Sequence, residues 1–230
     1  MNRLLIIREN QLFSQISEEE YLSLNLIHRF KEAAANTYIY FEAQYHQYLY
    51  FLKEGFVKIG YYDKNGQQVI KEVIGKGDIF GQVLLEPHNL EGEFALAYKS
   101  PVSLCAFRID EFQKLLEARP DLSLKFTRQV GQKLAKIEMR MVNLLHRDVR
   151  DRLLFFLHSL TVQFSQFLHA NHFEINGLFT HDDIARLIGS SRQTVTTLLN
   201  ELEREGLLAF RRGYLSLPDV KKIQNALNVV

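Results

Sequence analysis

Side chains that could act as nucleophiles or metal ligands are few along this 230-residue chain. The single cysteine, Cys105, excludes an internal disulfide and any site within one chain that needs several cysteines. It lies in the apolar run LCAF, so we expect a buried small hydrophobe rather than a reactive thiol. His46 and His88 could in principle bind a metal or haem, and His169 and His172 are three residues apart without a third ligand nearby. We expect all four to be ordinary surface, loop or hydrogen-bonded histidines.

A denser group of hydroxyl, amide and guanidinium side chains lies within residues 179–219. Thr180 can cap a helix whose first turn holds two aspartates, which the helix dipole favours at that end. Gly189 then allows a tight turn, Ser190 or Ser191 can cap a second helix, and Gly206 is placed to end it. Two short helices joined through a glycine turn fit a helix-turn-helix, whose second helix enters the major groove of DNA. An ordinary helical hairpin is the alternative.

A short hairpin follows the two helices. LLAF and YLSL are strand candidates, joined by Arg211, Arg212 and a glycine. Such a wing places two cations beside a phosphate backbone. Together with the small polar residues that begin the second helix, it favours a winged helix-turn-helix over a plain helical hairpin.

The charge of the chain is nearly balanced. Lys and Arg number 28 against 27 Asp and Glu, and residues 149–230 carry nine basic and eight acidic side chains. A DNA-binding surface must therefore be local and rest on a specific motif. Hydrophobic residues make up 47% and charged residues 24%, as in ordinary soluble proteins. No run resembles a signal peptide or a membrane span, so we expect a cytoplasmic protein without a membrane partner.

The elements before this motif change character twice. Residues 11–35 suggest a helical lead-in capped by Ser17. From about residue 37 to 109, short aromatic and β-branched runs separated by glycines predict a compact antiparallel barrel or roll. Within it, Val57, Ile59 and Tyr61 share one face, and Asn65-Gly66 predicts a tight hairpin turn with positive φ at both residues.

Helical periodicity begins at residue 110, breaks at Pro120 and restarts with Asp121 as the expected cap. An apolar stripe then spans about six turns, consisting of Leu122, Phe126, Val130, Leu134, Ile137, Met141 and Leu144. The stripe is either the face of a helix packed on its own domain or the narrow seam of a two-stranded coiled-coil dimer. Another helix is expected at residues 148–167.

These features together resemble the cyclic AMP receptor protein and fumarate–nitrate regulator (CRP/FNR) family over nearly the full length. The run YLYFLKEGFVKIGYYDKNGQQVIKEVIGKGDIFGQ is similar to the family's β-roll, and IGSSRQTVTTLLNELEREGLL is similar to its recognition helix. The resemblance implies an α+β fold with an antiparallel, cyclic-nucleotide-binding-like β-roll at 1–118, a dimerisation helix at 119–147 and a winged helix-turn-helix at 148–230. It also favours the dimer seam, because the family dimerises through that helix.

The resemblance further implies roles for single residues. Base-reading side chains are expected at Arg192, Gln193, Thr196 and Thr197, and phosphate-contacting hydroxyls at Thr180, Ser191 and Thr194. Arginine can bind guanine with two hydrogen bonds and glutamine can do so with adenine. Gln193 replaces a common glutamate and Thr197 a common arginine, so the half-site is expected to differ from the usual family motif.

The effector site implied by the resemblance departs from the family's pattern. The corresponding positions are Gly81, Gln82, Val83, Glu93 and Phe94. Gln82 stands where a ligand-binding glutamate is usual, and Glu93-Phe94 stand where an arginine-serine pair binds the cyclic phosphate. An anion beside Glu93 without a compensating arginine is repelled, so cyclic AMP is not expected as the effector. One cysteine excludes the family's iron–sulfur cluster within one chain, and no other effector is identified.

The sequence thus predicts a homodimeric, non-enzymatic transcription regulator that is gated by an unidentified effector at the β-roll. Its expected partners are double-stranded DNA with an inverted-repeat site and a second copy of itself, with RNA polymerase as a further candidate. Two alternatives remain. One is a cupin-like barrel enzyme, which needs clustered metal ligands that Tyr45-His46-Gln47-Tyr48 does not supply. The other is a DNA-binding protein whose β-roll is only a dimer scaffold.

Overall fold

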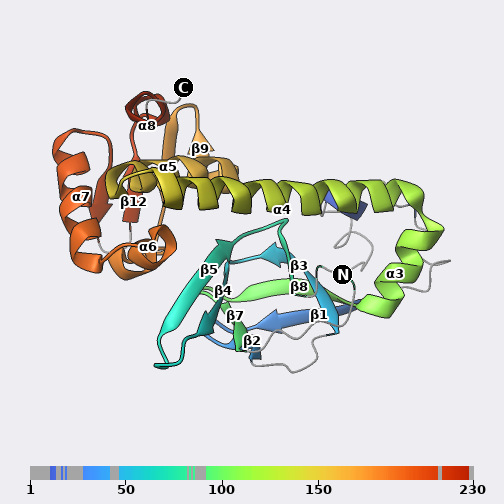
Figure 1. Ribbon diagram of the computed structural model, residues 1–230. Coiled ribbons are helices and arrows are strands. Elements are labelled where there is room, and N and C mark those ends of the chain that lie inside the picture. Colours follow the sequence, from blue (N-terminus) through green and yellow to red (C-terminus); the bar gives the residue numbers. More distant parts are fainter. Residues whose placement is uncertain are drawn as a thin grey trace. The chain divides into compact units, whose positions relative to one another are not determined.

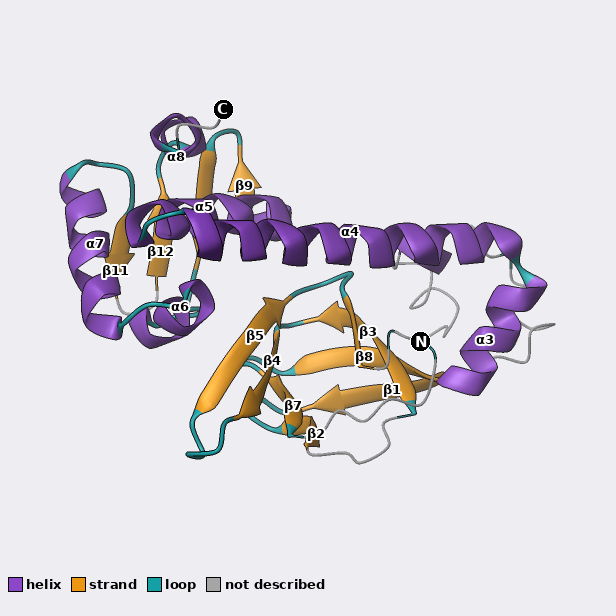
Figure 2. Ribbon diagram, in the orientation of Figure 1, coloured by secondary structure: helices purple, strands orange, loops and turns teal. Residues whose placement is uncertain are grey.

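The computed structural model of the chain describes residues 11–13, 17, 19, 28–41, 47–81, 83, 85, 92–211 and 214–227. The chain divides into two compact units, Met1–Lys136 and Ile137–Val230, and the division falls inside one long helix. Figure 1 follows the elements along the chain, and Figure 2 distinguishes helices from strands. The sequence analysis expected three parts, with the dimerisation helix as a part of its own. That division stays a prediction, since the long helix is shared by the two units.

In its described residues, the N-terminal unit contains two antiparallel four-stranded sheets, ordered β1-β8-β3-β6 and β2-β7-β4-β5 (Figure 1). The strands are β1 His28–Ala33, β2 Tyr38–Phe41, β3 Tyr48–Glu54, β4 Val57–Tyr62, β5 Gln68–Ile74, β6 Ile79–Gly81, β7 Glu93–Ala97 and β8 Val102–Arg108. This arrangement confirms the predicted roll of short strands.

Strand β3 is buried on both faces. Tyr50 and Leu52 belong to a core shared with the second sheet, whereas Leu49 and Phe51 pack on the other side with Phe112. Successive strand residues point to opposite faces, so a strand covered on both sides becomes a continuous apolar run. This double burial explains why YLYFL lacks a period of two. Strand β8 is arranged in the same way, and Cys105 lies on it as the expected buried residue, 5% exposed.

The β4–β5 hairpin forms where a turn was expected, but its turn type differs from the prediction. Gly66 has a φ of +74°, while Asn65 does not have a positive φ. The Gly66 N–H donates to the carbonyl of Asp63 at 2.9 Å. The Asp63 carboxylate accepts from the N–H groups of Asn65 and Gln67, at 2.8 and 2.9 Å. The hairpin therefore has a type I turn followed by a left-handed glycine, stabilised by the Asp63 side chain.

The alternation along β4 continues as expected against β7, with Val57 and Ile59 buried and Tyr61, near the end of the strand, 42% exposed. The register of β4 against β5 shifts between Ile59 and Gly60, where β5 has one extra residue. One further expectation about this unit is wrong. Residues 28–33 form strand β1 and not part of a helix, because their backbone pairs with β8, with Phe30 opposite Cys105. The predicted helix start at Ser17 lies almost wholly outside the described residues; nearby, Gln11–Phe13 form a 3-10 turn, η1.

Two helices follow the roll, α3 (Ile109–Ala118) and α4 (Pro120–His146). Pro120 is the first residue of α4, a position where the missing N–H of proline costs nothing. Asp121 therefore lies in the first turn and does not cap the helix; it pairs with Arg119 at 2.9 Å. Phe112 of α3 and Leu122 of α4 pack against the first sheet.

In its described residues, the C-terminal unit combines the end of α4 with four further α-helices, a 3-10 helix and a small antiparallel sheet. The sheet has the order β11-β12-β10-β9 among the described residues. The bounds are α5 Val149–Gln163, η2 Ser165–Phe167, β9 Leu168–His169, β10 His172–Ile175, α6 His181–Ile188, α7 Arg192–Arg204, β11 Ala209–Arg211, β12 Tyr214–Leu217 and α8 Val220–Ala226. Asp148 caps α5 by accepting from the Asp151 N–H at 2.8 Å. Figure 2 shows α6, α7 and strands β11 and β12 within this unit.

Candidate nucleic-acid interface

Helices α6 and α7 are joined by a turn with a specific cap at each helix end. Thr180 and Asp183 form a capping box, in which each side chain accepts the other's backbone N–H, at 3.1 and 2.9 Å. Gly189 ends α6 with a φ of +64°. Ser191 caps α7 by accepting from the Thr194 N–H at 3.0 Å. The predicted helix-turn-helix is confirmed, with the second of the two candidate serines as the cap.

Helix α7 has one buried face and one exposed polar face. Val195, Leu199 and Leu202 are buried within the unit. Arg192, Gln193 and Thr197 are exposed. They share an arc of about 140° with Thr196 and Asn200, since an α-helix turns about 100° per residue. Exposed Asn200, which the sequence analysis did not single out, lies within this arc one turn beyond Thr196. We refer to these five residues as the reading face.

Thr196 differs from its neighbours on the reading face because its hydroxyl is already engaged. Its Oγ1 donates to the Arg192 carbonyl at 2.9 Å and lies 2.7 Å from Nδ1 of His181. A carbonyl oxygen only accepts, so the hydroxyl proton goes to Arg192, and the Nδ1 proton of His181 is donated to Thr196. Thr196 therefore offers DNA its methyl group and one remaining lone pair.

His181 connects α6 with α7 and with β11, and it was not expected from the sequence. Its ring lies at the start of α6, bonds to α7 through Thr196, and contacts Phe210 of β11 with centroids 4.8 Å apart. Burial, with a smaller contribution from the charge of Arg192, lowers the pKa of His181 below its usual 6.5. The ring is thus neutral at pH 7. Its partners are fifteen or more residues away, so no local pattern indicated it.

The three hydroxyls predicted to meet phosphates are exposed and lie at the N-terminal ends of α6 and α7. Free backbone N–H groups and the helix dipole favour an anion at such ends. Thr180 donates its proton to Asp183 at 2.6 Å, and the hydroxyls of Ser191 and Thr194 are 2.8 Å apart. Phosphate oxygens only accept, so Thr180 has to redirect its proton to bind one, whereas the Ser191–Thr194 pair retains a proton to donate.

The predicted wing is present as strands β11 and β12, which pair antiparallel with Arg211 opposite Tyr214. Arg211 is exposed. Arg212, the other expected cation, lies outside the described residues. The wing is attached to α6 by the contact of Phe210 with His181, so the cation and the reading face belong to one packed unit.

The apolar stripe of α4 divides into a buried and an exposed part. Phe126 is 6% exposed and contacts Phe112 in the core of its own unit, with centroids 5.2 Å apart, and Val130 is partly buried there. Packing on its own domain therefore accounts for the first turns. The remaining predicted seam residues are exposed: Leu134 55%, Ile137 56%, Met141 61% and Leu144 41%.

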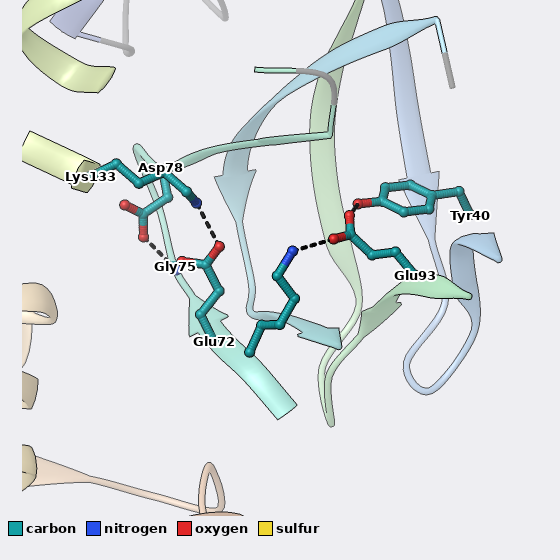
Figure 3. A network of polar contacts seen from close by, with 7 residues as sticks. Tyr40, Glu72, Gly75, Asp78, Glu93 and Lys133 are labelled. Carbon is teal, nitrogen blue, oxygen red and sulfur yellow. Dashed lines mark hydrogen bonds and ion pairs between the residues drawn. The ribbon is translucent and has the colours of Figure 1, made fainter. Parts of the chain in front are cut away.

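Glu93, expected to face an effector, forms an internal polar network (Figure 3). Its carboxylate accepts from the Tyr40 hydroxyl at 2.7 Å and forms an ion pair with Lys71. The residue is buried, and burial with the adjacent Glu93 charge raises the pKa of Tyr40. The sequence analysis overlooked both partners. The repulsion it ascribed to an unpaired Glu93 is reduced, because Lys71 offsets the charge.

The described residues among the predicted effector contacts come from β6, from β7 and from the segment after β6. Glu93 and Phe94 are adjacent in β7 and point to opposite faces. Fully buried Phe94 contacts Tyr38 and Tyr62, with centroids 5.9 and 5.3 Å apart. Gly81, at the end of β6, has a φ of +84°. Val83 packs against the core beside α3, and Gln82 lies outside the described residues.

A second polar contact connects α4 to the roll within the N-terminal unit (Figure 3). Lys133 of α4 pairs with Glu72 of β5 at 2.5 Å. The nearby Asp78 carboxylate accepts from the Gly75 N–H at 3.0 Å, and burial raises the pKa of Asp78. The Lys133–Glu72 ion pair thus connects the middle of α4 to strand β5.

Two of the four histidines considered as metal ligands are described, and they lie opposite each other in the small sheet. His172 bonds to Ser216 at 2.9 Å and pairs with His169 across β9 and β10. His46 and His88 lie outside the described residues. Within the described part of the chain, no group of three His, Cys, Asp or Glu side chains could hold a metal ion.

Burial raises the pKa of the Cys105 thiol to about 11. Among the described helices, none is long and apolar enough to cross a membrane.

Comparison with known proteins matches both units. The cyclic nucleotide-binding domain family matches residues 30–119, and the Crp-like helix-turn-helix domain family matches residues 151–226. The chain is 30% identical to a global nitrogen regulator of Nostoc sp. over 184 residues, 79% of this chain and 82% of that one. It is 32% identical to that of Synechocystis sp. over 181 residues, 78% and 80% of the two chains.

Solved structures show the same fold. CooA from Carboxydothermus hydrogenoformans superposes with a TM-score of 0.74 at 22% identity, covering 95% of this chain and 96% of that one. FixK2 from Bradyrhizobium japonicum also gives 0.74, at 20% identity, covering 89% and 99%. With its cyclic-nucleotide-binding-like roll, its helix-turn-helix and these relatives, the chain belongs to the CRP/FNR family of DNA-binding transcription regulators.

Proposed function

We propose that the protein acts as a homodimer that binds an inverted-repeat DNA site, with the reading face of α7 in the major groove. The observation that carries this proposal is the exposure of Arg192, Gln193 and Thr197 on a helix whose other face is buried. Arginine and glutamine side chains suit guanine and adenine edges. Thr196, with its proton engaged, suits a thymine methyl group. Arg211, Arg212, Ser191 and Thr194 supply the phosphate contacts.

The exposed part of the α4 stripe supports the homodimer. Leu134, Ile137 and Met141 recur at spacings of three and four, and each is more than half exposed. Contiguous exposed apolar side chains indicate an interaction surface, and a twofold dimer buries the same stripe from both copies. A dimer also matches an inverted repeat, whose half-sites carry the same symmetry.

Three further parts of the proposal follow from the family. The protein acts without enzymatic activity, because its relatives are transcription regulators. It acts in the cytoplasm, because its partner is chromosomal DNA. RNA polymerase is its partner at regulated promoters.

The β-roll is proposed to bind an effector that is not cyclic AMP. Some relatives are named cAMP-activated regulators, such as that of Pasteurella multocida, 28% identical over 162 residues, 70% of this chain and 76% of that one. In this chain Lys71 and Tyr40 are bonded to Glu93. A cyclic phosphate would have to compete with a buried carboxylate for its cation, which is unfavourable. A roll that serves only as a dimer scaffold is the second candidate.

The proposal can be tested by retention of fragmented genomic DNA on the full-length protein. We expect the wild type to retain a discrete set of fragments, and the double variant Arg192→Ala/Gln193→Ala to lose this selectivity. Gln166→Ala serves as a matched control because Gln166 is exposed in η2, away from the reading face. Retention of the same fragments by the double variant would contradict the assignment of the reading face.

Two additional arms address the effector. Added cyclic AMP should leave the retained set and its affinity unchanged. A small-molecule extract should change the affinity if the roll binds an effector, and should leave it unchanged if the roll is only a scaffold.

A further inference from the structure

The C-terminal end of α6 receives hydrogen bonds from two other helices of its unit. The last carbonyl groups of a helix lack partners within it. The Ser190 N–H satisfies the Ala185 carbonyl at 2.9 Å. Nη2 of Arg140, from α4, donates to the Leu187 carbonyl at 2.8 Å, and Nη1 of Arg152, from α5, approaches the Gly189 carbonyl at 3.4 Å. Cations are also favoured at this end by the helix dipole.

Close packing reinforces these bonds at Gly189. A Cβ atom added there would lie 3.2 Å from Cδ2 of Leu144 and 3.4 Å from Nη1 of Arg152. Side chains of α4 and α5 therefore touch the backbone of the turn directly. Ser191, the cap of the reading helix, follows two residues later. The turn that sets the start of α7 is thus held by Arg140 and Leu144 of α4.

Arg140 and Leu144 are one turn apart on α4; Leu144 belongs to the exposed stripe, and Arg140 lies beside it. At about 100° per residue, Arg140 lies about 60° around the helix from Ile137. The same short length of α4, Ile137 to Leu144, therefore carries both the proposed dimer contacts and the contacts to the turn. All these residues belong to the C-terminal unit.

We propose that Arg140 is a positioning residue that sets which spacing between two half-sites the dimer accepts. By holding the turn before α7 against α4, it fixes the separation and angle of the two reading faces. This inference rests on the proposed homodimer and inverted repeat. One added base pair moves the half-sites apart by about 3.4 Å and rotates them by about 35°, so a rigid dimer discriminates strongly between spacings.

The test uses full-length protein and duplexes that carry identical half-sites with spacers shortened or lengthened by one and two base pairs. Arg140→Gln removes the guanidinium, and Arg140→Lys restores a cation. Arg128→Gln is the matched control. It makes the same substitution at an exposed position on the far side of α4 from Ile137. The affinity for a duplex with one half-site measures whether the reading face of a single subunit still binds DNA.

For the wild type and Arg128→Gln, we expect a change of one base pair to lower affinity about tenfold or more. In Arg140→Gln the same change of spacer should lower affinity by about threefold or less, because a charged hydrogen bond that fixes the turn is lost. Affinity for the single half-site should stay within about twofold, and Arg140→Lys should recover part of the spacing penalty.

Two outcomes would overturn the inference. One is an Arg140→Gln variant with the spacing profile of the wild type. The other is a uniform loss that includes the single half-site, which would mean that Arg140 only stabilises the fold. A wild type that binds all spacings and the single half-site alike would instead contradict the proposed dimeric function, and this inference with it.

Discussion

At the level of single residues, the reading face offers DNA side chains of different chemistry. Gln193 and Arg192 are exposed, and Gln193 has no side-chain hydrogen bond to the described part of the chain. Thr196 is already bonded to His181 and to its own helix. Free amide and guanidinium groups can form two hydrogen bonds to one base. We therefore assign sequence discrimination mainly to Arg192 and Gln193.

The first prediction concerns these two residues. Arg192→Ala and Gln193→Ala should each cost about 1–3 kcal/mol on the preferred site and relax the preference at one base pair per half-site. Fluorescence anisotropy with singly substituted duplexes measures both effects, and Gln166→Ala should leave them unchanged. If Gln193→Ala lowered affinity equally for specific and random duplexes, Gln193 would be a backbone contact.

His181 gives a prediction about pH. Its pKa lies below 6.5 in the folded protein because of burial and Arg192. As pH falls through 6.5, the unfolded state binds a proton at this position before the folded state does, so the stabilising contribution of neutral His181 decreases. His181→Asn removes this titration.

Urea unfolding at pH 7.5 and pH 5.5 checks the sign of the effect. The wild type should exceed His181→Asn in free energy of unfolding by more at pH 7.5 than at pH 5.5. Comparing the two proteins cancels the titration of the other histidines. A difference that is constant, or that grows towards low pH, would show that His181 is not held neutral.

At the level of elements, α4 changes role along its length. Leu122 and Phe126 complete the core of the roll, whereas Ile137 and Met141 are exposed. Ile137→Asp should yield a monomer, because burying an unpaired carboxylate at a dimer seam costs several kcal/mol. Sedimentation velocity measures the mass, and Gln132→Asp, at an exposed position on the other side of α4, should remain dimeric. An unchanged dimer in Ile137→Asp would reject this seam.

The wing provides a prediction of a different kind. Arg211→Ala should weaken binding to all sequences alike, because phosphates are the same everywhere. The slope of log affinity against log salt should become shallower by about one per subunit. Titrations at several salt concentrations on specific and random duplexes measure this slope, with exposed Lys222→Ala on α8 as the control. A loss confined to the specific site would instead make Arg211 a base contact.

Elements with local signals were predictable from the sequence, and those that depend on distant partners were not. The signals that begin and end α6 and α7 lie within a few residues of each helix end: the caps Thr180 and Ser191, and the glycines Gly189 and Gly206. Strand β1 depends on pairing with β8, whose partner residues are 69 to 79 positions further along the chain. The prediction of a helix at residues 28–33 did not take this long-range pairing into account, and the pairing outweighs local propensity.

The candidate site divides in the same way. Arg192, Gln193 and Thr197, which the family resemblance implied, are exposed on α7, whereas Asn200 in the same arc was not expected. The bond of His181 to Thr196, the partners of Glu93 and the contact of Arg140 with Leu187 join residues 15 to 53 positions apart in the sequence. Nothing in the spacing of a single sequence indicates such pairs, because side-chain direction depends on the assembled fold.

At the level of the whole molecule, α4 is the covalent connection between the two units. Its middle is bonded to the roll through Lys133 and Glu72, and its end to the turn before α7 through Arg140. In the proposed dimer, an effector at the roll would influence DNA binding through a difference in its affinity for two conformational states. The proposed regulator needs no catalytic chemistry for this coupling.

We propose that the protein reads a specific inverted repeat as a dimer. Selection of bound sequences from random duplexes, with the full-length wild type, tests it most directly. We predict an enriched motif of two identical half-sites in opposite orientation, with centres about 34 Å or one helical turn apart. Enrichment of a single unrepeated motif, or no enrichment over the starting pool, would contradict the account.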